Sequence, residues 1–75
     1  MEDKKQIKLD ADSALEFVTA AEKCDLDIDV FYNSVIIDAK SIIGVLSMDL
    51  NKVLTVRYGE RDTRFEKVLQ KYCVA

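Results

Sequence analysis

The segment D-A-K-S-I-I-G-V-L-S-M, from Asp38 to Met48, contains a short predicted helix around which we expect the rest of the chain to pack. Ser41 is a suitable N-cap residue, because its side-chain oxygen can accept a hydrogen bond from the free amides at Ile43 or Gly44. At about 100° per residue, Ile42, Ile43 and Leu46 fall on one side of this helix, and Val45, Met48 and Gly44 fall on the other. Both sides are apolar. Unless the helix is tilted deeply enough to bury both, one apolar side should face solvent as a recognition patch.

The hydrophobic periodicity of the whole chain predicts the element order β-α-β-β-α-β-α. Strands are predicted over Gln6 to Leu9, from Asp25 up to a hairpin turn at Asn33-Ser34, over Val35 to Ala39, and over Val53 to Tyr58. Helices are predicted from Ser13 to Lys23 or Cys24, from Ser41 to Met48 or Asp49, and from Asp62 or Thr63 to Cys73. This order is typical of an α+β fold, a two-layer open-faced sandwich with three helices on one face of a four-stranded antiparallel sheet. Residues 1–75 should form a single domain.

Composition and charge exclude several classes of function. Apolar residues make up 49% of the chain and charged residues 33%, as in soluble globular proteins. No apolar run reaches the roughly 20 residues needed to span a bilayer, and the N-terminal residues do not resemble a signal peptide. We therefore expect a cytoplasmic protein that does not bind membranes. The net charge of −3, without a concentrated basic face, predicts that nucleic acid is not a partner. We also expect a monomer.

The sequence contains no histidine, which removes Ser-His and Cys-His catalysis, phosphohistidine chemistry and the commonest metal ligand. Cys24 and Cys73 lie far apart, and their positions in predicted helices favour buried thiols without a disulfide. The run Asp25-x-Asp27-x-Asp29 begins like a calcium-binding EF-hand loop but lacks the glycine and glutamate that this loop requires. We therefore predict no metal, no cofactor and no catalytic residue, and hence a protein that is not an enzyme.

The segment Lys40 to Met48, K-S-I-I-G-V-L-S-M, resembles the regulatory-serine segment of the HPr family, the small phosphocarriers of the bacterial sugar phosphotransferase system. The similarity continues without a gap from Phe17 to Ser41, and the final helix is similar too. The resemblance implies a strand order of 1-4-2-3 and makes Ser41 a candidate for regulatory phosphorylation. It also implies that Ile42, Ile43 and Leu46 dock a protein partner, while Val45 and Met48 close the core.

The chain departs from the HPr family at the phosphorylation motif, G-L-H-[AT]-R-P-A. The alignment places Asp10 at the histidine position, Asp12 at the arginine position and Ser13 at the proline position, and the loop before this helix is several residues shorter. Asp10 and Asp12 have a simple structural explanation, because carboxylates stabilise a helix N-terminus. Alternatively, they imitate the negative charge of a phosphorylated family member.

Three functions are compatible with these features. The first is a non-catalytic HPr-like regulatory or adaptor domain that docks partners through the Ser41 helix and performs no phosphohistidine transfer. Its partners would be phosphotransferase-system components, an HPr kinase or a transcriptional regulator. The second is a phosphocarrier that uses an aspartate, Asp10 or Asp12, in place of histidine. The third is an unrelated interaction module on the same fold.

Overall fold

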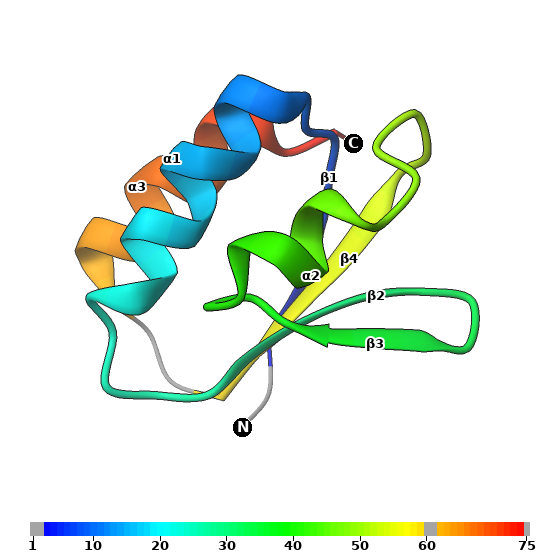
Figure 1. The fold of residues 1–75 in the computed structure, drawn as a ribbon. Helices are drawn as coiled ribbons and strands as arrows, with labels where there is room; N and C mark the ends of the chain where they lie inside the picture. The colour runs from blue at the N-terminus through cyan, green and yellow to red at the C-terminus, as the bar shows by residue number, and fades with distance from the viewer. Residues whose placement is uncertain (1–2, 60–61, 75) are drawn as a thin grey trace.

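The computed structural model describes residues 3–59 and 62–74, and it confirms the predicted order of elements (Figure 1). The strands are β1 (Asp3–Ile7), β2 (Ile28–Tyr32), β3 (Val35–Asp38) and β4 (Leu54–Tyr58). The helices are α1 (Ala11–Glu22), α2 (Ile42–Leu46) and α3 (Thr63–Tyr72). Asn33 has a φ of 53°, which confirms the tight turn predicted between β2 and β3.

The four strands form one antiparallel sheet in the order β1-β4-β2-β3, as the family resemblance implied. Alternate residues of β4 point into the core, and Leu54, Val56 and Tyr58 are all buried, as their spacing predicted. The helices cover that face of the sheet, and α1 packs against both α2 and α3 (Figure 1). The phenyl rings of Phe17 in α1 and Phe65 in α3 lie 5.8 Å apart at the centre of this core. The fold is therefore the predicted two-layer α+β sandwich.

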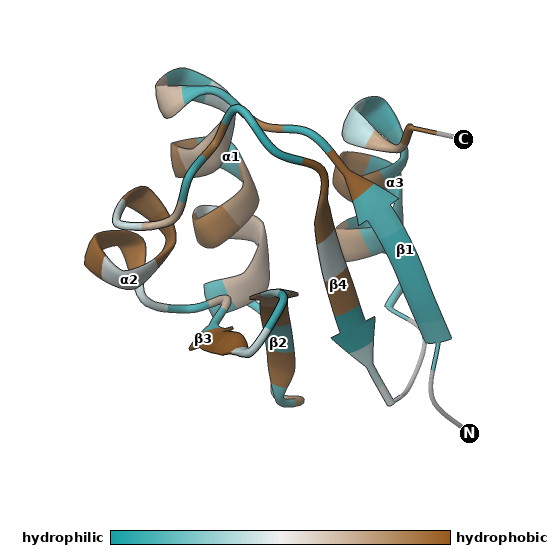
Figure 2. Ribbon diagram, turned by 90° about the vertical axis from the view of Figure 1, so that its right-hand side faces the viewer, coloured by the Kyte–Doolittle hydropathy of each residue, from teal (hydrophilic) through white to brown (hydrophobic). Residues whose placement is uncertain are grey.

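Strands β3 and β4 differ from the prediction by one residue each, whereas β1 and β2 differ more. β1 spans Asp3–Ile7 rather than residues 6–9, and most of its length is hydrophilic (Figure 2). An edge strand pairs on one side only and tolerates charged residues, so β1 need not show the apolar alternation that the prediction used. β2 begins at Ile28 rather than Asp25, because its partner β4 ends at Tyr58, which pairs with Ile28.

The N-cap of α1 is Asp10. The capping-box pattern in the sequence had indicated Ser13 instead. The Ser13 backbone amide donates to Asp10 Oδ1 at 2.8 Å, and the Asp10 amide donates to Ser13 Oγ at 2.8 Å. These reciprocal bonds form a capping box three residues earlier than predicted. In α3, the carboxylate of Asp62 accepts hydrogen bonds from the amides of Arg64 and Phe65, so Asp62 is the N-cap.

The prediction of two buried cysteines in helices is correct for the burial of Cys24, although Cys24 lies just after the end of α1, and it is wrong for Cys73. Cys73 is exposed and lies just after α3, which ends at Tyr72. The chain leaves the helix there because it pairs with the end of β1: Val74 N–H donates to Gln6 O at 2.9 Å, and Lys8 N–H donates to Tyr72 O at 3.0 Å. Both cysteines are free thiols.

Candidate functional site

The position of α2 is fixed at its N-terminus by Ser41. Ser41 has an extended backbone, and its Oγ accepts a hydrogen bond from Gly44 N–H at 3.1 Å, as the prediction allowed. At the other end, Ser47 Oγ–H donates to the Gly44 carbonyl at 2.6 Å, and the helix ends at Leu46 rather than near Met48. The result is a five-residue helix with both ends hydrogen-bonded.

Gly44 allows α2 to approach β3 closely. A Cβ atom built at Gly44 would lie 2.6 Å from Cγ2 of Ile37, a separation that non-bonded carbon atoms do not adopt. A larger residue at position 44 would therefore force α2 away from β3. This close approach determines which side of α2 is buried.

The two apolar sides of α2 differ strongly in exposure. Val45 is fully buried at 0%, whereas the side chain of Ile43 is 81% exposed and that of Leu46 is 46% exposed. Met48 is half-buried and packs against the core, as expected. Ile42 was expected on the exposed side but is half-buried and also packs against the core. We call Ile43 and Leu46 together the α2 patch.

The correction at Ile42 has a geometric cause. Ile42 is the first residue of α2 and directly follows the N-cap, so the tight contact between Gly44 and Ile37 brings the first helical turn down onto the sheet. A helical wheel assigns sides but contains no information on tilt. Of the three side chains predicted to be exposed, Ile43 and Leu46 are exposed and Ile42 is not.

Ser41 is exposed, so its hydroxyl group is accessible to solvent while its oxygen accepts the bond from Gly44. The preceding residue, Lys40, is held by a hydrogen bond from its amide to Asp38 Oδ1 at 2.9 Å. The candidate modification residue and the α2 patch thus lie on one short segment. Asp10 and Asp12 lie elsewhere, at the N-terminus of α1.

The carboxylate of Asp10 is occupied by its capping role. Hydrogen bonds from the backbone and hydroxyl of Ser13 lower the pKa of Asp10, so this side chain is ionised at neutral pH. Asp12 is exposed in the first turn of α1, where a negative charge interacts favourably with the helix dipole. Helix stabilisation therefore accounts for the positions of both aspartates.

Sequence reasoning missed the contacts that join α1 to α3. Glu16 accepts hydrogen bonds from Lys71 Nζ at 2.8 Å and from the Tyr72 hydroxyl group. These bonds lower the pKa of Glu16, with Lys71 as the main cause, and the bond to Glu16 raises the pKa of Tyr72. The partners are separated by 55 and 56 positions along the chain, so no local pattern could have indicated them.

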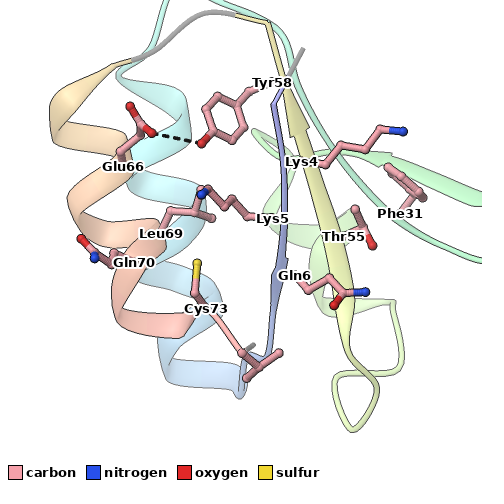
Figure 3. A pocket seen from close by; sticks show the side chains of 11 residues that line it. Lys4, Lys5, Gln6, Phe31, Thr55, Tyr58, Glu66, Leu69, Gln70 and Cys73 are labelled. Carbon is pink, nitrogen blue, oxygen red and sulfur yellow. Dashed lines mark hydrogen bonds between the residues drawn. The ribbon is translucent and has the colours of Figure 1, made fainter.

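A hollow of about 890 Å³ lies beside β1 and α3 (Figure 3). Figure 3 shows Lys5 pointing toward α3, whereas Lys4 points away from that helix, on the opposite side of the strand. The hollow therefore wraps around the edge of the sheet. Tyr58 donates a hydrogen bond to Glu66 at 3.1 Å inside it.

Within residues 3–59 and 62–74, no group of three or more His, Cys, Asp or Glu side chains is placed to hold a metal ion. In the same part of the chain, no helix is long and apolar enough to cross a membrane.

Solved structures of HPr proteins resemble this chain. The phosphocarrier protein HPr from Bacillus anthracis str. Ames aligns with a TM-score of 0.65 and 25% identity, over 95% of this chain and 89% of that one. The protein HPr-C-His from Thermoanaerobacter tengcongensis aligns with a TM-score of 0.64 and 27% identity, over 93% of this chain and 83% of that one. The sequence matches no protein-family model and no curated protein. The chain therefore has an HPr-like fold.

Proposed function

We propose that this chain is an HPr-like regulatory or adaptor domain that binds a protein of the sugar phosphotransferase system through the α2 patch and does not transfer phosphoryl groups. The main support is the 81% exposure of Ile43 on the same short helix as the fully buried Val45. A fixed, solvent-exposed isoleucine has no role in the core of this domain, and it is suited to contact a partner. The HPr-like fold supports the choice of partner class.

The residues at the start of α1 support the proposal that the chain does not transfer phosphoryl groups. The sequence has no histidine, and Asp10, at the position of the family's histidine, caps the helix through Ser13. An aspartyl phosphate at Asp10 would require its carboxylate to give up this role. No Lys or metal site contacts it in the part of the chain that the structure describes.

Binding can be tested by titrating the ¹⁵N-labelled protein with enzyme I and, separately, with the HPr kinase of the source organism. We expect at least one partner to shift the amide signals of α2, and Ile43→Lys to abolish these shifts. Ile36→Lys is the matched control, because Ile36 is also exposed, at 59%, but lies on β3. The proposal fails if neither partner perturbs α2, or if the two variants weaken binding equally.

Phosphoryl transfer can be tested by incubating the protein with phosphorylated enzyme I and measuring its intact mass. We expect no added phosphate. An adduct that is stable to acid but labile to base and hydroxylamine would instead establish the aspartate carrier, and Asp10→Asn would then identify its site.

Regulatory phosphorylation at Ser41 can be tested with the same kinase. Ser41→Asn removes the hydroxyl group but retains an N-cap acceptor, so it separates modification from loss of helix structure better than Ser41→Ala. We expect the kinase to label the wild type and Ser47→Ala, but not Ser41→Asn. Equal labelling of wild type and Ser41→Asn would exclude the site.

A further inference from the structure

A second apolar surface lies between α1 and α3, outside the α2 patch. A groove of about 490 Å³ runs along the surface between these helices. Its apolar lining includes Phe65, Ala20, Leu15 and Val68. Phe65 is buried and Ala20 is partly buried, whereas Leu15 is 59% exposed. Leu15 therefore offers apolar surface that the core does not use. We call this hollow the α1–α3 groove.

The two helices run in opposite directions, which defines the ends of the groove. At one end, Glu16 of α1 contacts Lys71 and Tyr72 at the end of α3. At the other end, the Cys24 thiol, just after α1, donates to Asp62 Oδ2 at 3.5 Å, and Asp62 caps the start of α3. The N-terminus of α1 thus lies beside the C-terminus of α3.

The two ends have opposite charge. Asp12 and Glu16 line one end, and Lys71, paired with Glu16 at 2.8 Å, offsets only one of these negative charges. Lys23 and Arg64 line the other end, where Asp62 offsets only one positive charge. The side chain of Arg64 is 82% exposed. The groove is therefore apolar along its middle, negative at the N-terminus of α1 and positive at its C-terminus.

A helix with charged ends would complement this arrangement of apolar surface and charge. Positions 12 and 23 are separated by about 16 Å along a helix axis, the length of three helical turns. An isolated helix is stabilised by acidic residues in its first turn and basic residues in its last turn. Such a helix would complement the groove if its acidic N-terminus lay over Lys23 and Arg64 and its basic C-terminus lay over Asp12.

We infer that the α1–α3 groove binds an amphipathic helix of a partner protein, about three turns long, running antiparallel to α1. Leu15 and Val68 contact the apolar stripe of the bound helix, and the charges at the two ends set its direction. A single helix of about three turns presents a small contact area, so the interaction should be weak and reversible. This site is independent of the α2 patch, so two proteins can bind the domain at once.

The test uses two alanine- and leucine-rich peptides of about 15 residues with identical composition. One peptide has acidic residues at its N-terminus and basic residues at its C-terminus, and the other has these charges exchanged. Titrated into the ¹⁵N-labelled protein, the first peptide should shift amide signals of α1 and α3 and bind about threefold to tenfold more tightly than the second.

Because the second peptide is also the poorer helix, a charge-exchanged protein provides the decisive comparison. The double variant Asp12→Lys, Arg64→Glu should shift the preference toward the second peptide. Both side chains are exposed, and a spectrum with wild-type dispersion verifies folding. Ile43→Lys, in the α2 patch, should leave peptide binding unchanged, so this test stands or falls separately from the proposed function. Absence of binding, shifts mapped outside the groove, or a preference unaffected by the charge exchange would overturn the inference.

Discussion

Cys24 and Cys73 differ in their surroundings and should differ in reactivity. Burial raises the pKa of the Cys24 thiol, and its hydrogen bond to Asp62 raises it further, so the reactive thiolate is scarce in the folded protein. Cys73 is exposed. A thiol reagent at neutral pH should therefore modify Cys73 rapidly and Cys24 only after denaturant is added.

Cys73→Ser should abolish the rapid reaction, while Cys24→Ser should abolish the reaction that requires denaturant. Rapid modification of both thiols in the folded wild type would contradict the burial of Cys24. Since both cysteines are free thiols, reductant should not change the melting temperature.

The residue identities predicted the capping of α1 only in part. Asp10-x-x-Ser13 departs from the usual capping-box pattern, because serine stands where glutamate or glutamine is normal, whereas Ser13-x-x-Glu16 matches the pattern. The structure favours the first because Glu16 is engaged with Lys71 and Tyr72 on α3. The choice of N-cap in α1 thus depends on contacts with α3, which is distant in the sequence.

At the level of elements, α2 depends on the absence of a side chain at Gly44. An alanine in a helix is normally about 0.5–1 kcal/mol more stable than glycine. Here its Cβ would overlap Cγ2 of Ile37. We expect Gly44→Ala to destabilise the domain by about 1–3 kcal/mol, measured by urea unfolding.

The control for this prediction removes the obstructing atom. In an Ile37→Ala background, Gly44→Ala should cost much less, because the remaining close contact of the new Cβ, with Ser41 Oγ at 3.1 Å, is milder. The same loss of stability in both backgrounds would show that the close contact between α2 and β3 is not its cause.

The exposures along α2 predict three different truncation energies. Val45→Ala should reduce the free energy of unfolding by about 2 kcal/mol, because it removes buried methyl groups. Ile43→Ala should stay within about 0.5 kcal/mol, and the half-exposed Leu46 should lie between, at about 1 kcal/mol. A loss of more than about 2 kcal/mol for Ile43→Ala would place this side chain in the core and remove the basis of the α2 patch.

For α2, sequence reasoning identified the cap from the residue type of Ser41. Helix periodicity placed Val45 and Ile43 on opposite sides, but only the HPr resemblance indicated that the Val45 side is buried. Sequence reasoning could not identify the burial of Ile42, which depends on how far α2 tilts onto β3. It also could not relate Leu15 to Val68, because the groove between them exists only after α1 and α3 pack.

At the level of the whole molecule, the order of elements was predictable because each element has its own period and boundary signals. The sheet order was implied only by the HPr resemblance, since periodicity does not specify which strands pair. The predicted β1 was too late in the chain because its pairing with β4 involves charged residues such as Lys4 and Lys5. Tertiary contacts thus account for the differences between prediction and structure.

The stability of the whole domain should depend on three carboxylates that hold the helices in place. Hydrogen bonds lower the pKa of each in the folded state: from the Ser13 amide to Asp10, from Lys71 to Glu16, and from the Phe65 amide to Asp62. Their ordinary pKa values are 3.8 for the aspartates and 4.5 for the glutamate. The folded protein therefore binds fewer protons than the unfolded chain at acidic pH.

The folded domain should therefore lose stability as the pH falls. The stabilisation is fully present above the ordinary pKa values, and it is lost as the pH falls below about 4.5 and through the lowered values of the folded state. The sequence contains no histidine, so urea unfolding should show nearly constant stability around neutral pH, then a decline on the acid side.

The triple variant Asp10→Asn, Glu16→Gln, Asp62→Asn retains side-chain oxygens that can accept these hydrogen bonds, but it cannot titrate. It should be less stable than the wild type at neutral pH, and its stability should decline much less with acid, so that the two curves converge at low pH. An unchanged acid decline in the triple variant would mean that other carboxylates control the acid unfolding. The negative charges of Asp10, Glu16 and Asp62 would then add little to the hydrogen bonds that cap α1 and α3 and connect them.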